Sequence, residues 1–111
     1  MKARNHEILA DEPEELGGND SGATPSELLL SSLAGCKLIT MRMYAERKGW
    51  ELGETTISLR YKEKGEPTIV EKMIRFTGDL DAAQVQRMID ISGRCPVAKM
   101  LKESIVYEII Q

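Results

Sequence analysis

The clearest structural signal in this chain is the run Thr24-Pro25-Ser26-Glu27-Leu28-Leu29-Leu30-Ser31-Ser32-Leu33-Ala34-Gly35-Cys36. Thr24 suits an N-cap, Pro25 suits the first helical position, and Glu27 can complete a capping box with Thr24. The pattern predicts a helix that continues to about Lys48 and stops at Gly49. Because its first half is apolar nearly all round, we expect that half to be buried on several sides.

Two alternating segments, 55–64 and 68–78, follow this helix. Apolar residues recur at every second position in each segment, as expected for half-buried strands. One face of each strand carries, in order, Ile57, Leu59 and Tyr61, then Val70, Ile74 and Phe76. The turn residues between the segments predict an antiparallel hairpin.

The rest of the chain alternates between helix and strand signals. A helix of about ten residues is expected after the cap Asp81, with Gln84 as its capping partner. A further helix is expected over 96–103 and a last strand over 105–110. We also expect a short strand within 4–9.

The composition indicates one domain over 1–111, with an exposed loop at 10–24. The order of elements predicts an α+β fold, with a long helix against a mostly antiparallel sheet. The net charge of −3 argues against a nucleic-acid surface. No run approaches the ~20 apolar residues of a membrane span, and the N-terminus lacks a signal-peptide pattern. We therefore expect a cytoplasmic protein, in which thiols stay reduced unless they are catalytic.

The two cysteines are the candidate chemical groups. Cys95 precedes Pro96 at an expected helix start, and Arg94 is its neighbour, so local electrostatics favour its thiolate. Cys36 lies in the middle of an apolar helix, where burial disfavours the charged form. Each cysteine could instead be a packed core thiol. Two cysteines with His6 far away in sequence cannot form a four-ligand zinc site.

The segment Gly-Gly-Asn-Asp-Ser-Gly-Ala-Thr-Pro-Ser-Glu-Leu-Leu-Leu at 17–30, Gly35-Cys36, and Cys95-Pro96-Val97-Ala98-Lys99-Met100-Leu101 about 60 residues later resemble the OsmC/Ohr family. These are the osmotically inducible protein C and organic hydroperoxide resistance proteins. The resemblance implies an intertwined homodimer with the long helices at its centre. It also implies that Cys36 attacks an organic hydroperoxide and becomes a sulfenic acid. Cys95 then resolves it as a disulfide, and a dithiol reductant restores the pair without a metal or organic cofactor.

Three residues are possible supports for this chemistry. In the hydroperoxide resistance branch, an acid directly after the helix-opening proline holds a catalytic arginine from the N-terminal segment; here Ser26 has that position. Glu27 lies nine residues before Cys36, about 180° around the helix, so it could support Cys36 only across a dimer interface. Arg4 is the N-terminal arginine candidate, and Arg94 could stabilise either thiolate.

Two other interpretations remain at this stage. Ser26 favours a non-catalytic OsmC-like dimer that binds a small molecule at its interface. The cysteines could also be core residues of a dimeric structural protein. Dimerisation is expected on its own account, because the helix over 28–39 is apolar on more faces than a three-stranded sheet can cover. The core is expected to include Met41, Met43, Met73, Met88 and Met100.

Overall fold

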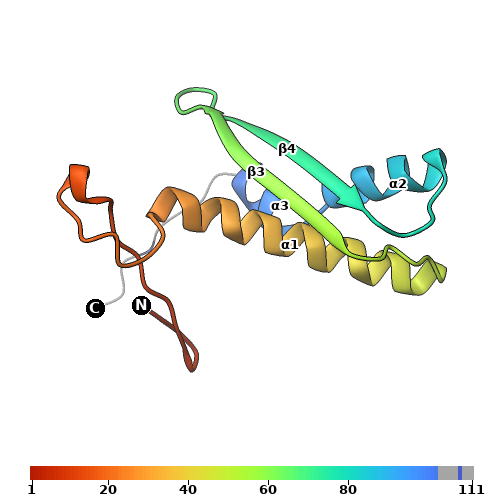
Figure 1. Ribbon diagram of the computed structural model, residues 1–111, viewed down its shortest axis with the longest axis horizontal. Coiled ribbons are helices and arrows are strands. Elements are labelled where there is room, and N and C mark those ends of the chain that lie inside the picture. The colour runs from red at the N-terminus through yellow and green to blue at the C-terminus, as the bar shows by residue number, and fades with distance from the viewer. Residues whose placement is uncertain (103–107, 109–111) are drawn as a thin grey trace. The chain divides into compact units, whose positions relative to one another are not determined.

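The computed structural model describes residues 1–102 and Glu108 (Figure 1). It divides into two compact units, Met1–Ser32 and Leu33–Gln111. The boundary falls inside the longest helix, so each unit is described by itself.

The N-terminal unit begins with a small hairpin rather than with one strand over 4–9. Strands β1 (Lys2–Ala3) and β2 (His6–Glu7) pair in antiparallel fashion. Arg4 lies in the turn between them with a φ of 56°, in the left-handed region that reverses the chain. The short strand predicted within 4–9 is present as β2, whereas its partner β1 was not predicted.

The loop that follows is organised around one carboxylate. Asp11 accepts backbone hydrogen bonds from Glu12 at 2.8 Å, Asn19 at 3.0 Å and Ser21 at 3.1 Å. These bonds hold the pKa of Asp11 below its ordinary value, because they stabilise the charged form. Gly18 lies so close to the Glu12 carbonyl that a side chain would clash. The loop also contains a single 3-10 turn, η1 (Glu14–Leu16).

The bounds of the long helix were predicted correctly, but the expected burial of its first half is not found: none of residues 25–36 is buried, and the buried side chains of the helix are those of Lys37, Met41 and Ala45. Helix α1 runs over Pro25–Lys48 and ends before Gly49, whose φ is 70°. The Thr24 amide donates to Glu27 Oε1 at 2.9 Å, and the Glu27 amide donates to Thr24 Oγ1 at 3.2 Å. The capping box therefore fixes the first turn of α1.

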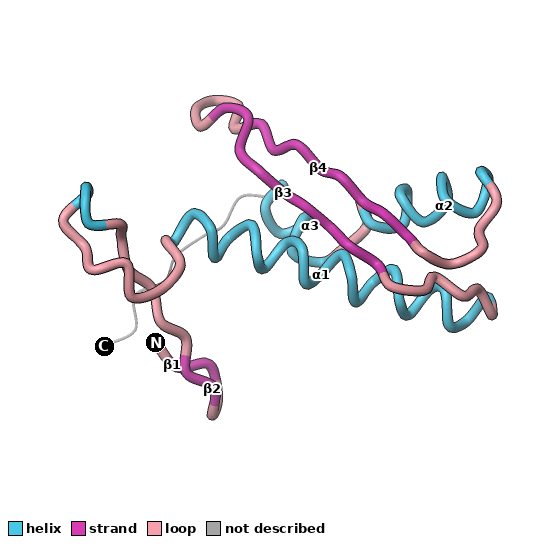
Figure 2. The backbone as a smooth tube through the Cα atoms, in the orientation of Figure 1, coloured by secondary structure: helices cyan, strands magenta, loops and turns pink. Residues whose placement is uncertain are grey.

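The predicted hairpin is also present. Strands β3 (Thr55–Glu63) and β4 (Ile69–Phe76) pair in antiparallel fashion, with Ile57 opposite Ile74 (Figure 2). In β3, half-buried and exposed positions alternate as far as Lys62, whereas in β4 Val70, Ile74 and Phe76 are half-buried and Lys72 is exposed. Lys72 lies opposite Leu59, so its side chain is on the same face of the hairpin as that of Leu59.

Two shorter helices complete the described chain. Helix α2 (Ala82–Ser92) starts at the Asp81 capping box, and helix α3 (Pro96–Lys102) follows a short turn. Both confirm the prediction. The strand expected over 105–110 lies outside the described residues except at Glu108. The described elements form an α+β fold with small antiparallel sheets.

The core of the second unit lies between α1 and α2. Met41 and Ala45 of α1 pack with Met88 and Ile91 of α2. Partly buried side chains surround this cluster: Leu38, Tyr44, Trp50, Leu52, Ile74 and Phe76. None of the described helices has the length and apolar character needed to span a bilayer.

The methionine prediction was right for only two of the five positions. Met41 and Met88 are fully buried, whereas Met43, Met73 and Met100 are each more than half exposed.

A polar clamp also ties α1 to α2. Arg87 Nε donates to Tyr44 Oη at 2.9 Å. This hydrogen bond is the main reason that the pKa of Tyr44 is lowered and the pKa of Arg87 is raised.

Candidate active site

Cys95 lies in the turn between α2 and α3 and is fully buried. At the end of α2, the Arg94 amide donates to the Ile91 carbonyl at 2.9 Å. At the start of α3, the Lys99 amide donates to the Cys95 carbonyl at 3.2 Å. The two helices thus hold the Cys95 backbone from both sides and direct its sulfur into the second unit.

Lys37 of α1 reaches this sulfur. Its side chain is 8% exposed, and its Nζ donates to the Ser92 carbonyl at 3.1 Å and to Cys95 Sγ at 3.7 Å. Ser92 is the last residue of α2, so its carbonyl is one of those that the helix leaves unpaired. The negative end of the helix dipole favours a cation there.

A second lysine approaches the same point from the hairpin. Lys72 Nζ donates to Ser92 Oγ at 3.0 Å, and that hydroxyl donates to the Ile89 carbonyl at 2.6 Å. Desolvation lowers the pKa of Lys72, and the charge of Lys37 lowers it further. Cys95 acts in the opposite direction when it is negatively charged. The cluster of Lys37, Lys72, Ser92 and Cys95 is called the lysine–thiol cluster below.

Cys36 lies one residue before Lys37 in α1 and is half-buried. Both cysteines are free thiols in this structure. Consecutive helical residues point about 100° apart, so Cys36 and Lys37 belong to one turn but to different faces. Among the described residues, no side chain forms a hydrogen bond with the Cys36 sulfur. The turn that carries Cys36 is thus also the turn that reaches Cys95.

The other predicted site residues have separate places. Arg4 is exposed in the turn of the N-terminal hairpin, and Glu27 has the capping role that sequence reasoning gave as its alternative. Both belong to the N-terminal unit. Arg94 is exposed, although it directly precedes Cys95.

The sequence reasoning missed the two lysines. The signal for Lys37 was a charged residue directly after Cys36 inside an otherwise apolar run. The signal for Lys72 was a charge in the inner series of β4, between Val70 and Ile74. Both positions break a hydrophobic pattern, and such breaks in a core-facing pattern are characteristic of functional sites.

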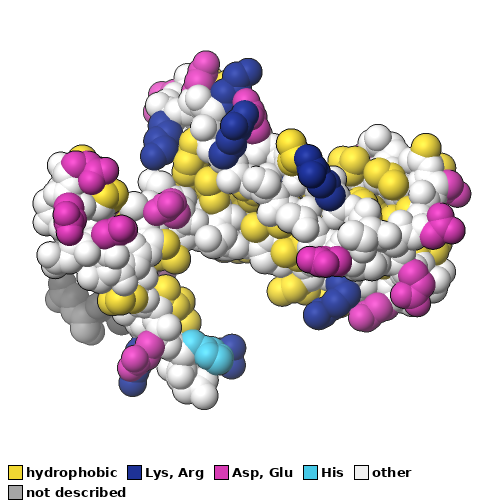
Figure 3. Space-filling view, in the orientation of Figure 1, with side chains coloured by type: hydrophobic (Ala, Val, Ile, Leu, Met, Phe, Trp, Pro, Cys, Tyr) yellow, Lys and Arg dark blue, Asp and Glu magenta, His cyan; other side chains and the backbone are white. Residues whose placement is uncertain are grey.

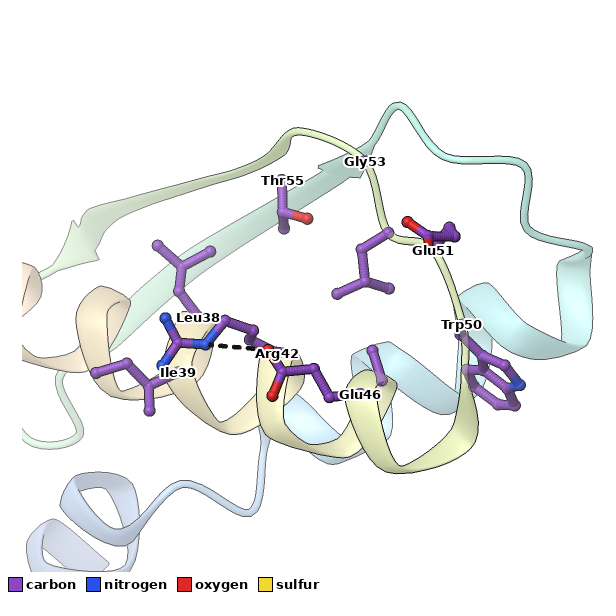
Figure 4. A pocket seen from close by; sticks show the side chains of 10 residues that line it. Leu38, Ile39, Arg42, Glu46, Trp50, Glu51, Gly53 and Thr55 are labelled. Atoms are coloured by element: carbon purple, nitrogen blue, oxygen red, sulfur yellow. Dashed lines mark ion pairs between the residues drawn. The ribbon is translucent and has the colours of Figure 1, made fainter.

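A hollow of ≈ 430 Å³ lies along the second half of α1. Figure 4 shows α1 on one side of it and the segment before β3 on the other. The Arg42–Glu46 ion pair, at 3.9 Å, lies on its α1 side. Its lining residues are Leu38, Ile39, Arg42, Ala45, Glu46, Trp50, Glu51, Leu52, Gly53 and Thr55. Neither cysteine lines this hollow.

The family model described as OsmC-like protein matches residues 17–110. Among solved structures, a protein from Psychrobacter arcticus 273-4, named for an osmotic stress induced and detoxification response, is 28% identical. The match has a TM-score of 0.75 and covers 86% of this chain and 72% of that one.

Two further solved structures share the fold. An organic hydroperoxide resistance protein OsmC from Legionella pneumophila is 19% identical, with a TM-score of 0.62 over 83% of this chain and 71% of that one. An OsmC like protein from Mycoplasma pneumoniae is 20% identical, with a TM-score of 0.61 over 82% and 68% of the two chains. No curated protein matches this chain.

Proposed function

Because this chain belongs to the family of OsmC-like proteins, we propose that it is a thiol-dependent peroxidase acting on organic hydroperoxides in a stress response. The observation that carries the proposal is the single turn of α1 that holds Cys36 and, through Lys37, reaches the Cys95 sulfur. Both cysteines are free thiols, as the reduced state of a two-cysteine redox cycle requires.

The proposed cycle has three steps. The Cys36 thiolate attacks the terminal peroxide oxygen, the O–O bond breaks, and the alkoxide takes a proton to leave as an alcohol. The Cys95 thiolate then attacks the Cys36 sulfenic acid, forms the disulfide and expels hydroxide, which is protonated to water. A dithiol reductant reduces this disulfide and is itself oxidised to a disulfide. No step calls for a metal or an organic cofactor.

The names of the structural neighbours support this choice of chemistry. One is named for a detoxification response and another for organic hydroperoxide resistance.

We propose that the active form is a homodimer. Cys36, Ile39 and Met43 are three and four residues apart, so they form one stripe along α1. Ile39 is 51% exposed and Met43 is 57% exposed. Figure 3 shows hydrophobic side chains at the surface among the charged ones. A second copy covering this stripe would enclose Cys36 and could supply the cation that its thiolate needs. Sedimentation should give the mass of a dimer, and a monomer at micromolar concentration would contradict this.

The first test is a steady-state assay with cumene hydroperoxide and dithiothreitol. Cys36→Ser should reduce turnover at least ~1000-fold, because it removes the attacking sulfur. Cys95→Ser should still consume one equivalent of hydroperoxide and leave Cys36 as a sulfenic acid that dimedone traps. Undiminished turnover in Cys36→Ser would reject the proposal.

The hollow along α1 favours a second candidate, a non-catalytic dimer that binds a small apolar or acidic molecule. It predicts that stoichiometric cumene hydroperoxide leaves both thiols reduced, while a fatty acid raises the melting temperature of the chain. A rapid Cys36–Cys95 disulfide, identified by peptide mass mapping, would eliminate this candidate.

A further inference from the structure

The ammonium of Lys37 has an unusual environment for a charged group. The side chain is 8% exposed, and its two hydrogen-bond acceptors are the Ser92 carbonyl and the Cys95 sulfur. A buried cation is costly unless an anion pairs with it. The Ser92 carbonyl is a dipole at a helix end and offers only partial negative charge.

Cys95 is the group that can provide the missing negative charge. Within residues 1–102 and Glu108, the two ion pairs are Arg42–Glu46 and Arg60–Glu71, and no carboxylate pairs with Lys37. A thiolate at 3.7 Å from Nζ would turn the buried contact into an ion pair. The same charge acts on Lys72, where a negative Cys95 raises the lysine pKa.

We propose that Lys37 is a positioning residue that stabilises the Cys95 sulfur as a thiolate in the reduced chain and again when Cys95 leaves the disulfide. This assignment rests on the proposed peroxidase function and gives the two cysteines unequal roles. It also differs from what the sequence favoured, because Arg94, the neighbour of Cys95 in the chain, is exposed while Lys37 contacts the sulfur.

Lys37 then acts at two points of the cycle. In the resolving step it keeps Cys95 deprotonated and aimed while the Cys95–Cys36 bond forms and hydroxide leaves. In the reduction step one thiolate of the dithiol attacks Cys36 Sγ, and Cys95 leaves as the stabilised thiolate. The second reductant thiol closes the reductant disulfide and releases Cys36. Attack is directed to Cys36 because Cys95 is the better leaving group and is fully buried.

The first test separates the steps in a single turnover. Reduced full-length chain is mixed with one equivalent of cumene hydroperoxide, and the Cys36 sulfenic acid and the disulfide are followed by quenched flow and mass spectrometry. In Lys37→Met the disulfide should form at least ~10-fold more slowly, so the sulfenic acid accumulates. Consumption of hydroperoxide should change less than ~3-fold, because Cys36 is the attacking sulfur.

Conservative and matched variants distinguish charge from packing. Lys37→Arg should restore disulfide formation to within ~3-fold of the wild type, because it keeps a cation at the sulfur. Lys99→Met removes an exposed lysine near Cys95 and should behave as the wild type. Wild-type disulfide formation in Lys37→Met, or equal slowing of both steps without rescue by Lys37→Arg, overturns the proposal. If Lys37→Met fails to fold, Lys37→Gln replaces it as the uncharged variant.

A second measurement is independent of the peroxidase reaction. The disulfide is formed with diamide and equilibrated with oxidised and reduced dithiothreitol. Loss of the stabilised thiolate should make the disulfide of Lys37→Met at least ~10-fold harder to reduce, a shift of about 30 mV. If the wild type does not react with hydroperoxide but Lys37→Met still shows this shift, the peroxidase function is rejected and the role of Lys37 is retained. An unchanged equilibrium, or no disulfide in the wild type, rejects the role of Lys37.

Discussion

The two units of this chain are stabilised by different physical means. None of residues 1–32, all of which the structure describes, is buried, and the loop of that unit is organised by hydrogen bonds to Asp11. The unit from Leu33 onward has an apolar core and holds Lys37 and Cys95 within it.

The difference shows which of the two units can hold reactive side chains in fixed positions before a substrate binds. A buried core fixes side-chain positions closely, so it can hold an ammonium against a sulfur at the end of a helix. A loop held by backbone hydrogen bonds to one half-buried carboxylate depends on the charge of that carboxylate. We therefore expect the core unit to respond most to lost packing and the N-terminal unit to respond to acid.

The largest expected effect is on the core. Met41→Ala should lower the free energy of unfolding by about 2–5 kcal/mol, because it opens a cavity at a fully buried position. The matched variant Met43→Ala lies two residues away in α1, where the side chain is 57% exposed. In the monomer it should cost less than about 1 kcal/mol. Urea denaturation followed by circular dichroism measures both.

Measuring Met41→Ala and Met43→Ala at several protein concentrations makes this comparison more specific. If a second copy covers Met43, the cost of Met43→Ala should grow with protein concentration, because association adds to stability. The cost of Met41→Ala should not. Equal costs for the two variants at every concentration would contradict the contrast between a covered and an uncovered face of α1.

Local signals were strong enough to predict most elements of the core unit. The capping residues Thr24 and Asp81 marked the starts of α1 and α2, and alternation marked the hairpin, because caps and periodicity act over a few residues. The expected first strand is present as β2, but the Arg4 turn and β1 were not predicted, since a left-handed residue at a non-glycine position has no clear sequence signal.

The site was harder to predict because its contacts are long-range. Lys37 and Cys95 are far apart in sequence, and only the packing of α1 against α2 brings them together. Local electrostatics pointed to Arg94 because it is the neighbour in sequence, yet its side chain is exposed. The prediction of reactive cysteines came from a motif, and their surroundings could come only from the fold.

An intermediate effect is expected at Lys72, as a dependence of the free energy of unfolding on pH in the alkaline range. The pKa of Lys72 is lowered by desolvation and by Lys37, so the unfolded chain keeps this proton to a higher pH than the folded chain does. Between the lowered pKa and the ordinary pKa of 10.5, the unfolded state binds more protons, and stability rises with pH. The wild type should therefore gain stability relative to Lys72→Met between pH 8 and 11.

The gain should stay below about 1 kcal/mol, because the Lys72 ammonium is largely screened by solvent. Urea denaturation of both proteins across this range gives the difference, in which the other titrating groups cancel. A flat difference, or one that falls with pH, would mean that Lys72 carries no desolvation cost and would weaken the link between the hairpin and the lysine–thiol cluster.

The smallest expected effect is at Asp11, and it tests the N-terminal unit. Because the pKa of Asp11 is lowered by its backbone hydrogen bonds, its contribution to the loop is present above the ordinary pKa of 3.8 and is lost as pH falls through the lowered pKa. At pH 6, Asp11→Asn should speed amide exchange at Asn19 and Ser21 roughly three- to tenfold. The urea midpoint of the core unit should not change.

Asp20→Asn is the matched control, because it removes a charge from the same loop without removing those three hydrogen bonds. In the wild type, the amide resonances of Asn19 and Ser21 should move together as Asp11 is protonated, and in Asp11→Asn that movement should disappear. Faster exchange in Asp20→Asn as well would indicate that net charge, and not the hydrogen bonds to Asp11, stabilises the loop. A loss of core stability in Asp11→Asn would instead show that the two units unfold together, and the contrast between them would then be one of composition and not of stability.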